Sequence, residues 1–279
     1  GFYSSFQYVT LILGQLLALA VLVLLQHFLL SERQLQVWGW RIPFVIGALA
    51  AVAAAGLRRS MPESQVFESM PAQARRSQMR QLLQHPREVL TVVGLTMGGT
   101  LSFYTFTTYT QKFLVNTTGF DTQTATAVCA LALLVFACLQ PLVGLLSDHI
   151  GRRPVLIAFG VLGTLCTVPL MRALAVAAGP GHALLLCVLA LTIVSGYTAV
   201  NAVVKAELFP TQIRALGVAL PYAIAVALFG GTAEYIALWA KAAGHEAAFY
   251  WYVCACTAIS LIVYLAMPDT QRSSRIPPS

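Results

Sequence analysis

The sequence predicts an all-α integral membrane protein, and three features of its composition predict it. Hydrophobic residues make up 58% of the 279 residues and charged residues only 10%, a balance typical of membrane proteins rather than soluble domains. Apolar runs long enough to cross about 30 Å of hydrocarbon recur along the chain. The net charge of +7 comes from basic residues in short loops between these runs, where membrane topology explains them. We therefore expect a lipid bilayer around the chain and no nucleic-acid partner.

Eight of the apolar runs are candidate membrane spans. All should be helices, because an open sheet edge leaves backbone groups unpaired in lipid. The spans run over about 6–26, 38–57, 89–111, 123–146, 155–175, 183–205, 216–240 and 247–267. The six cysteines lie inside apolar runs without metal-ligand spacing, so no metal site is expected.

The distribution of lysine and arginine predicts the orientation of these spans. When the connections are assigned to alternate sides of the membrane, eleven basic residues fall on one side and four on the other. The basic side is expected to be cytoplasmic, which places the C-terminus inside. The longest connection, 58–88, is polar, basic and cytoplasmic in this arrangement. It separates two spans in 1–57 from six spans in 89–267, and a short cytoplasmic tail follows over 268–279.

A charged turn joins two of the longest apolar runs. It reads Gly144-Leu145-Leu146-Ser147-Asp148-His149-Ile150-Gly151-Arg152-Arg153-Pro154. The pattern Gly-x-Leu-x-Asp-x-x-Gly-Arg-Arg resembles the loop signature of the major facilitator superfamily of transporters. That resemblance implies two six-helix halves that expose a central cavity to each side of the membrane in turn. Eight of the expected twelve transmembrane helices of the major facilitator fold are then present. The implied partner is the missing part of the N-terminal half of the same fold.

Polar side chains gather in the third and sixth spans. The third span carries Thr100, Ser102, Tyr104, Thr105, Thr107, Thr108, Tyr109, Thr110 and Gln111, and the sixth carries Thr192, Ser195, Tyr197, Thr198 and Asn201. Such groups are unfavourable against lipid, so they should face a water-filled cavity or another helix. In the superfamily that the charged turn resembles, these two spans line the cavity. The other interpretation is that part of the set only joins helices by hydrogen bonds.

Glu234 is the most unusual residue in the chain, because the seventh span is otherwise uncharged from Ala215 to Ala240. A carboxylate at such a depth costs about 2.5–3.5 kcal/mol on insertion scales, and desolvation favours its protonated form. We therefore predict a proton-coupling role for Glu234. A structural ion pair, or a position at the outer interface, would explain it equally simply.

Arg41 follows Trp38-Gly39-Trp40 at the outer end of the second span. A guanidinium held at that edge is suited to bidentate contact with a substrate carboxylate. The alternative is an anchor that reaches the headgroups beside interfacial tryptophans.

A second group of charges lies at the cytoplasmic end of the spans. Glu207 and Arg214 follow the sixth span, and we expect them to form charge pairs with Asp148, Arg152 and Arg153. Such pairs would hold the cytoplasmic side closed and break when it opens. The simpler interpretation is that these charges only anchor the loops in the cytoplasm.

Further stretches resemble a narrower family, the metabolite:proton symporters, and within it the bacterial carriers of 2-oxoglutarate. The stretches are Trp38-Gly39-Trp40-Arg41-Ile42-Pro43-Phe44, Phe103-Tyr104-Thr105-Phe106-Thr107-Thr108-Tyr109, Lys205-Ala206-Glu207 and Phe229-Gly230-Gly231-Thr232-Ala233-Glu234-Tyr235. The resemblance implies a bacterial inner-membrane protein that imports a dicarboxylate with protons as the coupling ion and without another cofactor.

A dianionic substrate needs cationic and hydrogen-bonding partners near the cavity. The candidate substrate-binding residues are Arg41, Tyr104, Tyr109, Lys112, Tyr197, Asn201 and Lys205.

Three other interpretations stay open from the sequence. The substrate could be another organic acid, or a zwitterion such as betaine or proline, for which Glu234 and Tyr235 could bind the cationic group. A membrane sensor that transports nothing would usually carry a sizeable soluble domain, and no loop here exceeds about 31 residues. A truncated fragment would also fail to transport. An enzyme is not expected, because no nucleophile, metal or phosphate-binding motif occurs.

Overall fold

The structure, a computed structural model, describes residues 1–25, 29–59, 82–210 and 212–269. Within those residues every regular element is helical, and eight helical stretches are long and apolar enough to cross a membrane. They follow the eight predicted spans in order. Most of the predicted central loop and most of the predicted tail lie outside the described residues.

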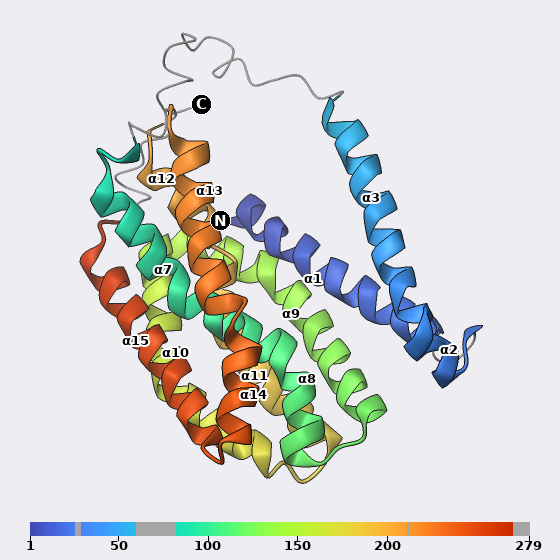
Figure 1. The fold of residues 1–279 in the computed structure, drawn as a ribbon. Coiled ribbons are helices and arrows are strands. Elements are labelled where there is room, and N and C mark those ends of the chain that lie inside the picture. Colours follow the sequence, from blue (N-terminus) through green and yellow to red (C-terminus); the bar gives the residue numbers. More distant parts are fainter. Residues whose placement is uncertain (26–28, 60–81, 211, 270–279) are drawn as a thin grey trace.

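The first two spans sit on one side of the molecule (Figure 1). Helix α1 (Phe2–Leu24) packs along α9, and its buried residues Ser5, Tyr8 and Ile12 recur at the spacing of one helix face. The short helices α2 (Glu32–Val37) and η2 (Gly39–Arg41) lead into α3 (Ile42–Arg59). Helix α3 contains no buried residue, and it stands apart from the bundle.

The third span is one continuous helical stretch that changes its winding twice. It consists of α7 (Pro86–Tyr104), the π-helical turn η3 (Thr105–Tyr109), α8 (Thr110–Phe113) and a second π-helical turn, η4 (Leu114–Thr118). The predicted end at residue 111 was wrong. Polar residues after that position stay helical because other spans provide partners for them, as Thr117 donates a hydrogen bond to Glu246.

The charged turn is as tight as the sequence predicts. Helix α9 (Thr122–Ile150) and helix α10 (Arg152–Ala175) are separated only by Gly151, whose φ of 98° favours glycine. At its other end, α9 begins at Asp121, whose side chain accepts a hydrogen bond of 2.9 Å from the backbone nitrogen of Thr124. Hydrogen bonds from Thr124 hold the pKa of the Asp121 carboxyl below its usual value.

The sixth and seventh spans are each interrupted. The sixth contains α11 (Pro180–Thr198) and α12 (Asn201–Leu208), and the seventh contains α13 (Arg214–Ala225), η5 (Val226–Gly230) and α14 (Ala233–Ala242). Helix α15 (Glu246–Ala266) closes the bundle by packing on α7 and α10, while α11 packs on α9 and α10. The core lies among these helices, and the breaks place polar side chains inside it.

Candidate functional site

A polar cavity lies where the first two spans face the third and seventh. Its volume is about 440 Å³, and its wall combines residues from α1, the η2–α3 segment, the third span, α9 and α14. We call it the Lys112 pocket. Its polar lining residues are Gln15, Thr107, Thr108, Gln111, Lys112, Thr126 and Glu234. The polar face of the third span therefore borders a cavity, as one of the two interpretations of the sequence requires.

The centre of this pocket is an ion pair between Lys112 and Glu234. The Lys112 Nζ donates to Glu234 Oε1, and the two side chains are 45% and 32% exposed. Each residue follows a π-helical turn: Lys112 comes after η3, and Glu234 comes after η5, in the first turn of α14. Such turns occur frequently at functional sites, and the start of a helix favours a carboxylate. The pairing joins the predicted proton-coupling residue to a predicted substrate-binding residue.

Two glutamines shape the walls of the pocket. Gln15 Nε2 lies 3.4 Å from the carbonyl oxygen of Thr107, to which it donates, and Gln111 Nε2 donates to Thr126 Oγ1 at 3.2 Å. Sequence reasoning did not place Gln15 in the site. Its signal was present, because Gln15 is the only polar residue between positions 11 and 24.

Arg41 lies beside the pocket rather than in it. Its guanidinium carbon is 4.7 Å from the centroid of the Trp40 ring, and Nη1 donates to the carbonyl of Val37 at 3.0 Å. Trp40 lines the cavity, whereas the exposed Arg41 does not. This geometry is that of an interfacial anchor, and the predicted contact with substrate stays a prediction.

Four of the predicted substrate-binding residues gather deeper in the protein, in what we call the tyrosine cluster. Its members are Tyr8, Tyr104, Tyr197, Asn201, Lys205 and Tyr222. The Tyr197 hydroxyl lies 3.3 Å from Thr100 Oγ1, and the Lys205 Nζ lies 3.7 Å from the centroid of the Tyr222 ring. Tyr104 and Tyr8 interact electrostatically with Tyr222. Tyr8 and Tyr222 were not expected from the sequence.

Tyr109 points away from both sites. Its hydroxyl donates to Glu246 Oε1 at 3.3 Å, and its ring packs edge-on against Phe249 of α15. Adjacent residues of a helix point about 100° apart, so Tyr109 cannot share the direction of the pocket residue Thr108. Lys241 completes this outer contact with an ion pair to Glu246 at 3.6 Å. The structure therefore gives Tyr109 a packing role and leaves its predicted substrate contact without support.

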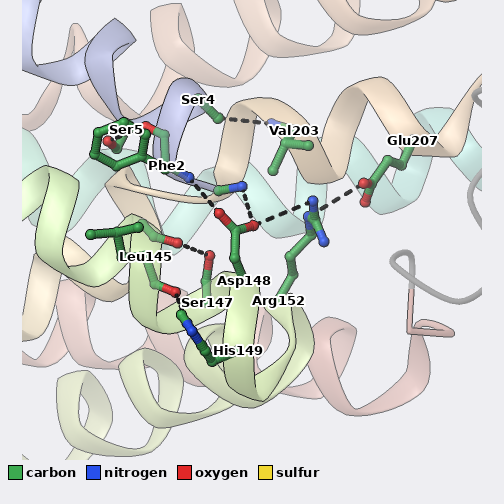
Figure 2. A network of polar contacts seen from close by, with 12 residues as sticks. Phe2, Ser4, Ser5, Leu145, Ser147, Asp148, His149, Arg152, Val203 and Glu207 are labelled. Carbon is green, nitrogen blue, oxygen red and sulfur yellow. Dashed lines mark hydrogen bonds and ion pairs between the residues drawn. The ribbon is translucent and has the colours of Figure 1, made fainter. Parts of the chain in front are cut away.

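At the opposite end, a charge network connects three helices (Figure 2). Asp148 accepts a hydrogen bond of 2.9 Å from the backbone nitrogen of Phe2, so a carboxylate of α9 caps the start of α1. Arg152 lies 3.8 Å from Asp148 and 3.3 Å from Glu207 Oε1 on α12. Ser4 Oγ also accepts a hydrogen bond of 3.2 Å from the backbone nitrogen of Val203. These contacts hold the start of α1 against α9 and α12.

Arg153 lies outside this network, contrary to the prediction. Its Nε and Nη2 donate to the carbonyl oxygens of Tyr264 and Leu265 at 3.2 and 2.5 Å, at the end of α15. Because Arg152 and Arg153 are consecutive on one helix, only one of them can point toward α12. Arg214 donates through Nε to the carbonyl of Phe209 at 3.3 Å.

The chain was compared with known proteins. The sequence profile of the Major Facilitator Superfamily matches residues 1–231 and 111–278. The alpha-ketoglutarate permease of Escherichia coli strain K12 is 48% identical over 99% of this chain and 63% of its own length. The citrate-proton symporter of Salmonella typhi is 27% identical over 91% of this chain and 59% of its own length. A crystal structure of a D-xylose-proton symporter shares the fold, with a TM-score of 0.63 at 22% identity over 96% of this chain and 63% of that chain. The chain thus spans less than two thirds of the length of these relatives.

Proposed function

The chain belongs to the Major Facilitator Superfamily, and from this premise we propose that it acts, within a complete transporter, as part of a proton-coupled symporter that imports 2-oxoglutarate or a related dicarboxylate. The observation that carries the proposal is the Lys112–Glu234 ion pair inside a polar cavity. The 48% identity to an alpha-ketoglutarate permease supports the choice of substrate class.

The ion pair provides a direct way to couple a proton to an anion. In the empty pocket, Lys112 is neutralised by Glu234. A substrate carboxylate that binds Lys112 displaces Glu234, and the displaced carboxylate then gains by taking up a proton. Protonation of Glu234 in turn frees Lys112 for the substrate. Each ligand therefore favours the binding of the other, which is what symport requires.

The opposite end of the molecule supports alternating access. The contacts of Asp148, Arg152 and Glu207 hold α1, from before the central loop, against helices from after it. Arg152 Nε, Arg152 Nη1 and Glu207 Oε2 are buried without a hydrogen bond among the described residues. A buried pair that is satisfied by charge alone is poised to separate when hydration becomes available. We propose that it keeps the cytoplasmic side closed while the Lys112 pocket is open.

The same reasoning gives an orientation. We propose a bacterial inner-membrane location with the charge network and the C-terminus on the cytoplasmic side, because the excess of basic residues lies on that side. The coupling ion is the proton, and no other cofactor is required by this mechanism.

A second candidate is import of a zwitterion such as betaine. Trp40 and Phe44 line the pocket near Glu234, and aromatic rings beside a carboxylate suit a quaternary ammonium group. The dicarboxylate is preferred because Lys112 already neutralises Glu234, which leaves a cationic group without an unpaired anion to bind.

The test is uptake of labelled 2-oxoglutarate by cells that express the complete reading frame, with and without a protonophore. Excess unlabelled succinate, shikimate and betaine serve as competitors. We expect protonophore-sensitive uptake that unlabelled 2-oxoglutarate blocks and betaine does not. Uptake no greater than that of empty-vector cells would remove the dicarboxylate proposal, and inhibition by betaine alone would favour the zwitterion.

A further inference from the structure

Lys205 is a buried cation without a counter-ion. Its side chain is 2% exposed, and among the described residues it has neither a carboxylate partner nor a hydrogen-bond acceptor. The contact that the structure records is the face of the Tyr222 ring, 3.7 Å from Nζ. A buried charge without a partner is unfavourable, and a ring face offsets only part of that cost. Lys205 is therefore in a state that an anion would stabilise.

A second polar group beside Lys205 is also unsatisfied. Asn201 lies four residues earlier on α12, so the two side chains share one helix face. Asn201 is 1% exposed, and its Nδ2 donates to the carbonyl oxygens of Tyr197 and Thr198 at 3.2 and 3.0 Å. Its Oδ1 has no hydrogen-bond partner among the described residues, and neither does the buried Thr96 Oγ1. Buried polar atoms of this kind are rare and usually have a partner in another state.

The cover over Lys205 depends on α1. Tyr222 lies against the ammonium, and Tyr8 of α1 interacts in turn with Tyr222 and Asn201. One turn earlier, Ser4 is bonded to Val203 on α12, and Asp148 caps the start of α1 (Figure 2). The contacts that keep α1 in place therefore also keep Tyr222 over Lys205.

We propose that Lys205 and Asn201 form a carboxylate-binding site on the cytoplasmic side of the transport path, and that the site opens only when α1 moves away and Tyr222 is released. The inference rests on the proposed function, since it assigns the site to the same dicarboxylate. In the present conformation the Lys112 pocket is accessible and the Lys205 site is covered. The two cations would then serve the substrate in opposite states of the transport cycle.

The first test compares the two faces of the membrane. Uptake of labelled 2-oxoglutarate is measured in right-side-out and inside-out vesicles that contain the full-length protein, either wild type, Lys205→Gln or Lys205→Arg. We expect Lys205→Gln to raise KM at the cytoplasmic face by about tenfold or more and KM at the outer face much less. Lys205→Arg, which keeps the charge, should restore most of the difference. Equal changes at the two faces, or none, would overturn the proposal.

The second test needs no substrate and therefore survives a failure of the proposed function. Lys205→Cys is introduced into full-length protein whose native cysteines have been replaced, and an anionic, membrane-impermeant thiosulfonate is added from each side. We expect slow modification from the cytoplasmic side that becomes several-fold faster when Tyr8→Ala is added. A cysteine equally reactive from the outer side, or unaffected by Tyr8→Ala, would contradict an α1-dependent cover.

Discussion

At the residue scale, the central feature is that two predicted functions meet in one contact. Glu234 stands out in the sequence because it is a charge inside an apolar span, and Lys112 because it ends a polar stretch. Their pairing could not be predicted, since it depends on the π-helical turns that rotate each residue into the pocket. A half-exposed ion pair contributes little stability, about 0–1 kcal/mol. Its position in the cavity is better explained by function.

The first prediction concerns Glu234→Gln, which keeps the shape of the side chain but cannot exchange a proton. We expect substrate exchange across the membrane to continue, because Lys112 remains available, while accumulation against a gradient is lost. Counterflow and net accumulation of labelled 2-oxoglutarate measure the two processes. Glu246→Gln is the matched control, since it removes a carboxylate outside the pocket and should keep accumulation. Loss of accumulation in both variants would show that Glu234 has no special role.

Removal of the Lys112 charge is the second prediction. A hydrogen bond to a charged group contributes about 1.5–3 kcal/mol, so Lys112→Gln should raise KM for 2-oxoglutarate at the outer face by roughly tenfold to a hundredfold. Lys112→Arg should raise it less, because the charge is retained. Initial-rate uptake over a range of substrate concentrations gives both values. An unchanged KM for Lys112→Gln would exclude Lys112 as a substrate contact.

At the element scale, the start of α1 is held closely against α9. A Cβ atom at Gly144 would lie 3.0 Å from the carbonyl oxygen of Gly1 and from the Cβ of Ser5. The sequence predicted a charged turn here and pairing among its charges, because the motif is contiguous. It could not show that Asp148 caps α1, since that contact joins residues 146 positions apart. Nor could it separate Arg152 from Arg153, whose directions depend on how α10 is rotated.

A larger residue at Gly144 tests this close approach. Gly144→Leu should displace α1 and weaken the closed arrangement, because the side chain has no space beyond Cβ. We expect disulfide formation between Ser4→Cys and Val203→Cys, in a background without native cysteines, to fall several-fold. Gly181→Leu is the control, since a Cβ there meets no atom within 4 Å. Equal cross-linking in the two backgrounds would mean that α1 does not depend on this contact.

The Arg152–Glu207 pair gives a further prediction. Removal of one partner leaves the other as an uncompensated buried charge, at a cost of about 3–5 kcal/mol. We therefore expect Arg152→Gln and Glu207→Gln each to lower the melting temperature of the full-length protein in detergent. The double variant should be more stable than the sum of the two single effects predicts. Strictly additive effects would argue against a direct interaction.

At the scale of the whole molecule, the eight spans and the interrupted bundle follow from properties that the sequence displays directly. Long uncharged runs must be helical in lipid, and the tight turn at Gly151 is visible as a charged motif. The division of the polar residues into the Lys112 pocket and the tyrosine cluster was not predictable, because it depends on the helix breaks in the sixth and seventh spans. Helix α3, which has no buried residue, lacks the packing surface against which its position would be judged.

The most direct test of the central claim, that Lys112 and Glu234 couple a proton to a dicarboxylate, is a measurement of proton movement. De-energised cells that express the complete reading frame are placed in weakly buffered medium, 2-oxoglutarate is added, and the external pH is recorded. We expect the medium to become alkaline as protons enter with the substrate, and we expect Glu234→Gln to abolish the change while counterflow continues. Substrate entry without alkalinisation in the wild type, or the same alkalinisation in Glu234→Gln, would contradict the account.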